Sequence, residues 1–577
     1  MSKFSELNIK ALLLIAIPML NLLFMHYFFY FQGILEWPWL YSEIVNITSV
    51  MFDVSVLIIS FLIIFNGRFK IAIAITQIIT LLWSFVNVMY GKFFFQYLSL
   101  SAINEAHGLG DSLVINSVKT AFYWYDFYYL ISAIIFFIVI KKVNSYRIRL
   151  RTTLRLLFVP LFSLIFALFT YTAYHFIHPR YRYNCDLLLF RYKELLFDSS
   201  RGGTPNLAHF QTGSIRVALF ELYEMLHVTE LTEEQKKHIE SYYSDYSLRT
   251  TNHQRNPRIK NVIFILLESF LSEPVDLFVD GKEITPFLNS LKRDSDVYYN
   301  GNMISDIGCG ESSDGQFIYM TGILPLKFRM TVGRVKDNLL PALPIVLKKN
   351  LSIDYSEIIS PTVPNLWQQS EMNIAYGFSN AFWLEDIVSE QSGIINDGMI
   401  FEFASRHLEN VKEPFFSLIL SLSTHSPYNK YTGDNYLKDN VTLNVLYRNY
   451  LNTCHYLDAQ IKAFFDSLKE MDYYDNSIII IASDHYAHID MMKMNGILST
   501  KTPLFIVNGD INKADSWKGD FHQLDLYTTL LDVLDINTKW RGLGHTIITS
   551  SYKSSVDTNV SQLSEWIIEG NYFKNSN

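Results

Sequence analysis

The chain has 577 residues, more than one hydrophobic core normally supports, so we expect two or more domains. Its net charge of −8, with no basic patch outside one short loop, argues against a nucleic-acid-binding protein. The three cysteines, Cys185, Cys309 and Cys454, are too few and too widely spaced to predict a zinc site or a disulfide framework.

The apolar residues are concentrated in the first third of the chain, which is typical of a membrane part followed by a soluble part. Five apolar runs are long enough to cross a hydrocarbon core of ~30 Å, namely 10–32, 44–65, 70–92, 121–141 and 153–177. The first run is longer than the apolar stretch of a signal peptide, and no small-residue cleavage site follows it. We therefore expect it to remain as an anchor.

The basic residues near these spans predict their orientation. Lys3 and Lys10 precede the first span, Arg68 and Lys70 join the second and third, and KKVNSYRIRLRTTLR joins the fourth and fifth, whereas the short loop EWPWLYSE has no Lys or Arg. By the positive-inside rule the N-terminus is cytoplasmic. Because the number of spans is odd, everything after about residue 178 is expected outside the cytoplasm.

Two features of the membrane part are candidates for function. Asp53 is an intramembrane carboxylate, which we interpret as structural because it lies near the outer end of its span, within reach of water or a neighbouring helix. The loop at 93–120 is amphipathic enough to lie in the membrane interface. A packed connector explains that loop equally well.

The chain between the membrane part and the soluble part reads as a tether. TEEQ at 232–235 is a capping box, with Thr232 as the cap and Gln235 reaching back, and it opens the polar helix EEQKKHIESYYSDY. We expect a membrane domain at 1–177, a helical linker at 178–258, a soluble domain at 259–550 and a tail at 551–577.

From residue 261 the pattern changes to short apolar runs rich in β-branched residues, separated by helical segments. The runs are NVIFILL, FFSLILSLS, SIIIIAS and PLFIVN. This alternation predicts an α/β domain whose central, mostly parallel sheet is covered by helices on both faces. In such sheets, ligands bind beyond the carboxyl ends of the strands.

Acidic and imidazole side chains follow three of these runs. Glu268 follows the first, His425 comes shortly after the second, and Asp484 and His485 follow the third. Because parallel strands end at the same edge of a sheet, these side chains are expected to meet there. Carboxylate oxygens and imidazole nitrogens suit Mn²⁺, Zn²⁺ or Mg²⁺, so Glu268, Asp484 and His485 predict a divalent metal site.

The stretch GCGESSDGQ, at 308–316, lies between the first two of these strands. The apolar run QFIYMTGI that follows predicts a helix, so a serine can sit at its N-terminus, where N–H groups and the helix dipole favour an anion such as a phosphoryl group. A divalent metal beside that serine would make its hydroxyl a nucleophile. One serine of the pair can serve instead as a helix cap.

Together these motifs resemble lipoteichoic acid synthase and its phosphoglycerol and phosphoethanolamine transferase relatives, within the alkaline phosphatase and sulfatase superfamily. NVIFILLES, ITPFLNSL, GCGESSD, LSTHSPY, the SDH at 483–485 and HQLDLYTTLLDVL carry the resemblance. It implies an alkaline phosphatase-like fold in a bacterial cytoplasmic membrane protein. The implied activity moves the headgroup of a phospholipid donor to a glycan or lipid acceptor of the cell envelope.

The resemblance also implies roles for individual residues. Glu268, Ser312, Asp484 and His485 correspond to the metal ligands, with Mn²⁺ the expected ion, and Ser312 is also the nucleophile, at a position usually held by threonine. His425 corresponds to a contact of the substrate phosphate or leaving group, and Trp367 to a tryptophan of the headgroup pocket. Gln369 and Ser360 stand where the synthase has arginine and histidine, which argues against glycerol-phosphate polymerisation.

Some roles and functions stay open at this point. His488, His522 and His545 are further candidates for the site, without a feature that separates ligands from loop residues. Neither Cys309 nor the serine pair leads a C/S-x-P-x-R motif, which argues against sulfate-ester hydrolysis. The alternatives are a metal-dependent phosphodiesterase or phosphatase that uses water as the acceptor, and a non-enzymatic, membrane-anchored binding protein with a degenerate site.

Overall fold

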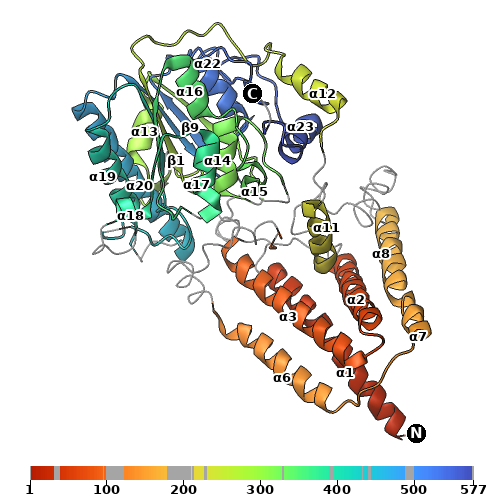
Figure 1. The fold of residues 1–577 in the computed structure, drawn as a ribbon. Coiled ribbons are helices and arrows are strands. Elements are labelled where there is room, and N and C mark those ends of the chain that lie inside the picture. Colours follow the sequence, from red (N-terminus) through yellow and green to blue (C-terminus); the bar gives the residue numbers. More distant parts are fainter. Residues whose placement is uncertain are drawn as a thin grey trace. The chain divides into compact units, whose positions relative to one another are not determined.

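The structure is a computed structural model of the chain. It describes residues 2–31, 39–94, 97–98, 100, 122–177, 209–210, 213–226, 230–308, 310–327, 331–364, 366–388, 395–431, 433–438, 443–487 and 499–574. Most of the loop predicted to be interfacial, and also Cys185, Cys309 and His488, lie outside these ranges. The chain forms two compact units that divide at residues 227 and 228 (Figure 1).

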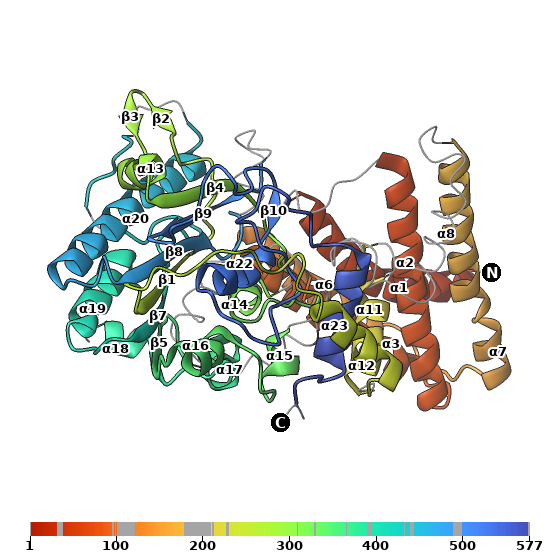
Figure 2. The ribbon, with the colours of Figure 1, turned by 90° about the horizontal axis from the view of Figure 1, so that it is seen from above.

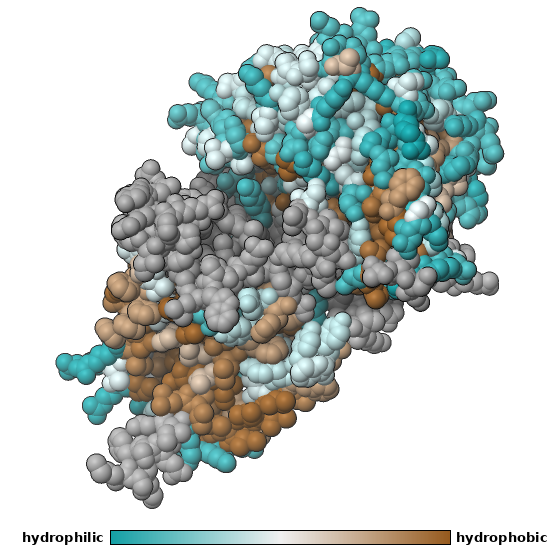
Figure 3. Space-filling view, turned by 180° about the vertical axis from the view of Figure 1, so that it is seen from behind, coloured by the Kyte–Doolittle hydropathy of each residue, from teal (hydrophilic) through white to brown (hydrophobic). Residues whose placement is uncertain are grey.

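The first unit is helical. Its elements are α1 (Ser2–Phe31), α2 (Trp39–Ile64), α3 (Phe69–Phe94), η2 (Trp124–Asp126), α6 (Phe127–Lys141), α7 (Leu150–Arg155), α8 (Phe158–Ile177) and α11 (Ser214–Leu226). Within the described residues, five segments are long and apolar enough to cross a membrane, at 10–31, 43–64, 69–92, 124–141 and 150–170. The five predicted spans are thereby confirmed as apolar helices. In the space-filling view of Figure 3 the surface over these helices is largely apolar.

Polar side chains join the spans inside the unit. Asn21 of α1 donates a hydrogen bond to Gln77 of α3 at 3.1 Å and accepts one from Ser132 of α6 at 2.7 Å. Hydrogen bonds of this kind replace the hydrophobic driving force that helices lack within lipid. They explain why a bundle this apolar keeps polar side chains on three of its helices.

Asp53 contacts a neighbouring helix, one of the two partners that we predicted, but its depth in the span differs from the prediction. It lies ten residues beyond Glu43 in the span 43–64, so the prediction that it lies near the outer end is wrong. Its Oδ2 accepts a hydrogen bond from the backbone N–H of Ile215, in the first turn of α11, at 2.9 Å. The structural interpretation of Asp53 therefore stands, since the carboxylate holds the N-terminus of a helix.

The second unit contains the sheet. Its strands are β1 (Asn261–Leu267), β4 (Val297–Ile304), β5 (Tyr355–Ile359), β6 (Asn380–Phe382), β7 (Phe415–Leu420), β8 (Ser477–Ser483), β9 (Thr502–Val507) and β10 (Phe521–His522), with β2 (Phe278–Val279) and β3 (Lys282–Glu283) forming a separate hairpin. Among the described residues the eight strands lie in the order β10-β4-β9-β8-β1-β7-β5-β6. Only β9 runs against its neighbours there, so the predicted mostly parallel sheet is confirmed.

Helices cover both faces of the sheet, as predicted (Figures 1 and 2). On one face lie α13 (Pro286–Arg293), α19 (Asp397–Leu408) and α20 (Val445–Glu470); on the other lie α14 (Ser312–Thr321), α16 (Leu343–Leu351), α17 (Gln369–Tyr376) and α22 (Asp525–Val533). Every residue of β1 and of β8 is buried, because both strands are central and sandwiched between helices. Each buried Ile or Leu contributes about 1.5–3 kcal/mol of hydrophobic stabilisation there.

The remaining short elements of the second unit are α15 (Val332–Val335), η3 (Leu366–Gln368) and α18 (Leu384–Ile387). Two further helices come from segments predicted to be linker and tail, namely α12 (Glu233–Tyr243) and α23 (Thr558–Glu569). The predicted capping box is present, since Thr232 Oγ1 accepts from Gln235 N at 3.2 Å and Gln235 Oε1 accepts from Thr232 N at 2.9 Å. The two helices pack together through the rings of His238 and Trp566, so both segments belong to the body of this unit.

Candidate active site

The carboxyl ends of the central strands place Glu268 and Asp484 side by side. In the ladder between β1 and β8, Leu267 pairs with Ser483, so the next residue of each strand leaves the sheet at the same level. The chain turns immediately after Glu268, where Ser269 has a φ of 51° and its N–H donates to Asp484 Oδ1 at 2.8 Å. This turn keeps the two carboxylates at the sheet edge.

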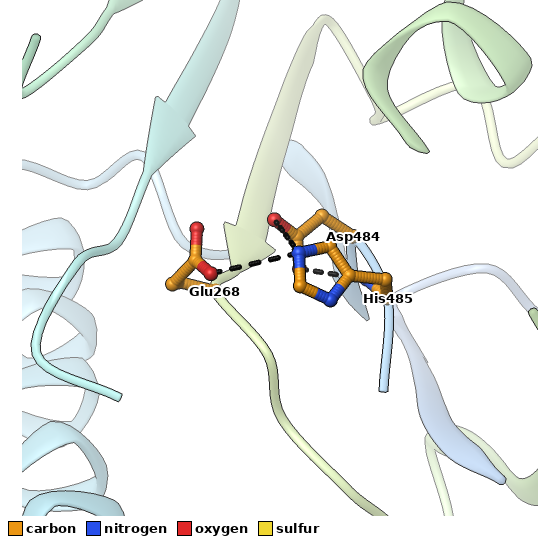
Figure 4. A group of neighbouring side chains, drawn as sticks. All are labelled: Glu268, Asp484 and His485. Atoms are coloured by element: carbon orange, nitrogen blue, oxygen red, sulfur yellow. Dashed lines mark hydrogen bonds and ion pairs between the residues drawn. The ribbon is translucent and has the colours of Figure 1, made fainter. Parts of the chain in front are cut away.

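Glu268, Asp484 and His485 form a buried cluster whose side chains point toward one another (Figure 4). One carboxylate oxygen from each acid and one nitrogen of the imidazole all lie within 4.8 Å of one another. His485 Nε2 is 3.6 Å from Glu268 Oε1 and 3.6 Å from Asp484 Oδ2. The structure therefore brings the three predicted metal ligands together, although they come from strands more than two hundred residues apart in sequence.

The hydrogen bonds around the cluster orient its donor atoms. His485 Nδ1 donates to the carbonyl of Tyr486 at 2.7 Å, so Nε2 is the ring nitrogen presented to the carboxylates. Burial and the charge of Glu268 raise the pKa of Asp484 to about 8. Two carboxyl groups this close in a buried site cannot both ionise cheaply without a positive charge between them. Two carboxylates and an imidazole therefore fit a hard or borderline divalent cation.

Ser312 is the first residue of α14 and reaches the cluster. Its Oγ is 3.2 Å from Glu268 Oε2 and 3.2 Å from His485 Nε2. The predicted helix after GCGESSDGQ is thus present, and its N-terminus points at the cluster. Ser313, the second serine of the pair, instead donates its hydroxyl to the Gly310 carbonyl at 2.8 Å, so the two serines have different surroundings.

The acidic and glycine residues of this loop have packing roles. Asp314 Oδ2 accepts from the backbone N–H groups of Gly308 and Gly310, at 2.9 Å each, which clamps the loop ahead of the helix. Gly315 lets α14 approach the end of β8, because a Cβ at this position would lie 2.3 Å from the Asp484 carbonyl oxygen. The helix that carries Ser312 is therefore seated directly on the residue that carries an acid of the cluster.

We expect Gly315→Ala to displace α14 and to lower both stability and activity. The added methyl meets backbone rather than a flexible side chain, and overpacking of this kind costs about 1–3 kcal/mol. Chemical unfolding of the detergent-solubilised chain measures that loss. Gly398→Ala in the first turn of α19 is the control, since its Cβ would meet only the ends of side chains, Tyr456 foremost. Equal stability of the two variants would contradict the seating of α14.

His425 and Lys430 lie in the segment that follows β7. His425 Nδ1 donates to the Ser426 carbonyl at 2.5 Å, which orients the ring. The charge of His425 also lowers the pKa of Glu268, against the effect of burial, so the imidazole lies within electrostatic reach of the cluster. Burial lowers the pKa of Lys430, and the charges of Glu268 and Asp397 oppose this effect of burial, so Lys430 lies within electrostatic reach of one acid of the cluster.

The residues matched to the headgroup pocket lie near α14. Gln369, which is buried at the start of α17, donates from Nε2 to Gln316 of α14 at 2.9 Å and to Asn373 at 3.0 Å. Its amide N–H groups are thereby committed to protein acceptors. Trp367 is half-buried in a left-handed turn with a φ of 55°, and Ser360 is buried directly after β5. The structure contains no headgroup, so the substrate contacts of these residues stay predictions.

The two described late histidines lie outside the cluster. His522 ends β10, and its Nδ1 pairs with Asp306 at 2.8 Å on the same sheet edge. The neighbouring Gln523 donates to the Asp484 carbonyl at 2.6 Å. His545 lines a polar cavity of about 330 Å³ with hydroxyl groups and Lys553, to whose carbonyl its Nδ1 donates at 2.8 Å. Metal coordination by His522 or His545 has no support from this arrangement.

Sequence reasoning missed several groups that complete the site. Ser421 accepts the Glu268 N–H at 2.9 Å, and Ser269 donates its hydroxyl to Glu268 Oε1 at 2.6 Å. Serines directly after strands are common, so no pattern singled these out. Lys430 had a usable signal, since it is a cation five residues after His425 in a loop already expected at the ligand edge.

Comparison with known proteins finds similarity to one family model and to several curated relatives. Residues 260–536 match the sulfatase family. Lipoteichoic acid synthase 2 of Bacillus subtilis (strain 168) is 31% identical over 303 residues, a match that covers 48% of this chain and 46% of the relative, less than half of its length. Lipoteichoic acid synthase of Staphylococcus aureus (strain USA300) is 25% identical over 488 residues, covering 79% of this chain and 71% of the relative.

Solved structures also resemble the chain. The crystal structure of a lipoteichoic acid synthase from Listeria monocytogenes is 21% identical and covers 53% of this chain and 81% of its own, with a TM-score of 0.46.

Proposed function

We propose that the chain, whose residues 260–536 are a sulfatase-family domain, is a membrane-bound, metal-dependent phosphotransferase. It would take the phosphoglycerol or phosphoethanolamine headgroup of a phospholipid and pass it to a hydroxyl of a cell-envelope glycan or lipid. The relatives named lipoteichoic acid synthase support the reaction class. Neither the donor headgroup nor the acceptor follows from them at this level of identity.

One observation carries the proposal. A serine hydroxyl at a helix N-terminus lies 3.2 Å from both a carboxylate oxygen and an imidazole nitrogen of a buried acid and histidine cluster. Serines that only cap helices are directed at backbone N–H groups of their own helix. Ser312 faces Glu268 and His485 instead, which is the arrangement expected of a nucleophile beside a metal.

The donor set fits a divalent cation held by Glu268, Asp484, His485 and Ser312. When bound, such a cation lowers the pKa of the serine hydroxyl and neutralises charge on the phosphate oxygens. The protein residues orient that chemistry, because Ser312 Oγ at the start of α14 lies 3.2 Å from both Glu268 Oε2 and His485 Nε2. Lys430 supplies a further positive charge to a phosphodiester bound there.

In the first half-reaction Ser312 Oγ gives its proton to water and forms a bond to the donor phosphorus. The bond from phosphorus to the diacylglycerol oxygen breaks, and that oxygen takes a proton from His425. The headgroup stays on Ser312 as a phosphodiester. In the second half-reaction His425 takes a proton from the acceptor hydroxyl, whose oxygen attacks phosphorus. The bond from phosphorus to the serine oxygen breaks, and that oxygen regains a proton from water.

The membrane unit suits an insoluble donor. Five apolar helices precede the catalytic unit, and the charge of their loops favours a cytoplasmic N-terminus. The catalytic unit would then lie outside the cytoplasm, where phospholipids of the outer leaflet are the donor within reach.

We expect the purified full chain, given Mn²⁺ and labelled phosphatidylglycerol or phosphatidylethanolamine, to release diacylglycerol and to carry the headgroup on the Ser312 peptide. Mass spectrometry of that peptide names the headgroup by its added mass. Removal of Mn²⁺ with a chelator should stop release, and its return should restore it. Release of the headgroup into water at the same rate with and without glycan acceptors would favour a phosphodiesterase. If neither the transfer product nor the released headgroup formed, both activities would be contradicted.

A further inference from the structure

The helix α11 of the first unit exposes apolar side chains and buries a charged one, the reverse of a helix exposed to water. Leu219, Leu222 and Tyr223 are 54%, 43% and 57% exposed. They are spaced at i, i+3 and i+4 and therefore lie on one face of the helix. Glu221 is buried, and it accepts a hydrogen bond from the backbone N–H of Leu100 at 2.7 Å. A helix in water exposes its charges and buries its leucines.

The start of α11 is fastened to the membrane-spanning helices by polar groups. Its first residue, Ser214, is fully buried and accepts a hydrogen bond from Trp83 of α3 at 2.6 Å. The N–H of Ile215 donates to Asp53 of α2 at 2.9 Å, and the guanidinium of Arg216 lies 4.1 Å from the ring centre of Phe52. These contacts hold one end of the helix against two spans (Figure 1).

Upstream of α11 the chain is fastened to the same unit. His209 stacks on Tyr97 with ring centres 4.7 Å apart, and its Nδ1 lies 3.2 Å from Ser214 Oγ. Tyr97 in turn is 2.5 Å from Nδ1 of His26 in α1. All three rings are buried, so His209, shortly before α11, is held inside the bundle.

The position of Asp53 gives the depth of this attachment. Asp53 is ten residues beyond Glu43, the first residue of its span, which at 1.5 Å per residue is ~15 Å, or half of a ~30 Å hydrocarbon core. The thirteen residues of α11 extend for ~20 Å. A helix that begins at mid-depth and has this length can return to the surface from which the chain came.

We infer that α11 is a re-entrant, half-membrane helix whose Leu219, Leu222 and Tyr223 face contacts lipid acyl chains. By the number of spans, the fifth apolar helix ends on the same side of the membrane as the beginning of α2, and the catalytic unit follows on that side. The half-membrane helix would therefore lie in the leaflet nearest the catalytic unit. The exposed face of α11 is apolar, like the exposed faces of the spans. Ile135 of α6, for example, is 47% exposed. The segment predicted to be a tether therefore contains a sixth membrane element.

Three cysteine variants of the full chain test this inference in vesicles of phosphatidylglycerol and phosphatidylethanolamine. Leu222→Cys reports on α11, Ile135→Cys on a lipid-facing span, and Glu234→Cys on the exposed polar helix α12. Each is labelled with a nitroxide, and collisions with oxygen, which concentrates in lipid, are compared with collisions with a water-soluble nickel chelate. The parent chain, labelled in the same way, is the blank for the native cysteines.

The expected result is a severalfold excess of oxygen over nickel collisions at Leu222→Cys and Ile135→Cys, and the reverse at Glu234→Cys. A nickel response at Leu222→Cys like that of Glu234→Cys would overturn the inference, because the face would then be in water. Shielding from both reagents would also overturn it, because protein would cover the face. Tyr223→Cys and Leu219→Cys repeat the measurement on the same face, with Leu219→Cys expected to be the deeper of the two.

Discussion

Ser312→Ala is expected to lower headgroup transfer by roughly three orders of magnitude or more, since removing a nucleophile abolishes the covalent route and leaves only binding and electrostatic effects. The added mass on the peptide that contains residue 312 should disappear with it. The fold should persist, because the hydroxyl is at the edge of the cluster and its loss leaves the hydrogen bonds of Ser313 and Asp314 in place. Release of diacylglycerol measures the loss of transfer, and the mass of the peptide measures the loss of the covalent headgroup.

Two matched variants separate nucleophile loss from loop damage. Ser313→Ala removes the neighbouring hydroxyl, which donates to Gly310 rather than to the cluster, and should retain most of the activity. Ser312→Thr keeps a hydroxyl at the same position and should transfer headgroups at a measurable rate. Unchanged transfer by Ser312→Ala, or equal losses in Ser312→Ala and Ser313→Ala, would remove Ser312 from the role of nucleophile.

Glu268→Gln and Asp484→Asn are each expected to weaken binding of Mn²⁺ at least about 100-fold, because each removes a charged oxygen donor from the cluster. Mn²⁺ should raise the melting temperature of the parent but not that of the variants, at a Mn²⁺ concentration below the Kd of the variants. A ligand stabilises the folded state only when its concentration exceeds its Kd appreciably. Without metal the variants should melt no lower than the metal-free parent, because the parent buries two carboxyl groups side by side. Elemental analysis and thermal unfolding provide readouts that do not depend on turnover.

Asp466→Asn is the control for loss of one negative charge. Asp466 is half-exposed near the end of α20, just before β8 begins, so it lies toward the sheet edge opposite the cluster. Metal content and thermal shift in this variant should match those of the parent. If Glu268→Gln or Asp484→Asn bound Mn²⁺ as the parent does, the cluster would not be the metal site.

The sequence could predict much of the catalytic unit because its patterns are local. The continuous apolar runs of β1, β7, β8 and β9 could only be buried strands, and all four are present. The shorter strands β4, β5, β6 and β10 were missed because their residues are partly polar or very few. The reversed direction of β9 was also beyond reach, since an apolar strand reads alike in both directions.

Contacts between distant segments lay beyond what the sequence could predict for the region after residue 178. The region after residue 178 read as a tether because polar helices and short apolar stretches resemble linkers when taken alone. In the structure α12 packs on α23, and the N-terminus of α11 is held by Asp53. Neither partner is close in sequence, so no periodicity or spacing could indicate these pairs.

The sequence by itself determined which segments are apolar enough for lipid, which become buried strands, and which side chains are delivered at the strand ends, because hydrophobic periodicity and strand direction act over a few residues. The family resemblance singled out Ser312, but only the tertiary structure gives its contacts with Glu268 and His485, and only the structure places His545 in a separate cavity. The contacts of Ser312 depend on how α14 is seated against the end of β8, through a Gly315 contact of backbone with backbone. Such a seating is a property of the packed domain and of no single segment.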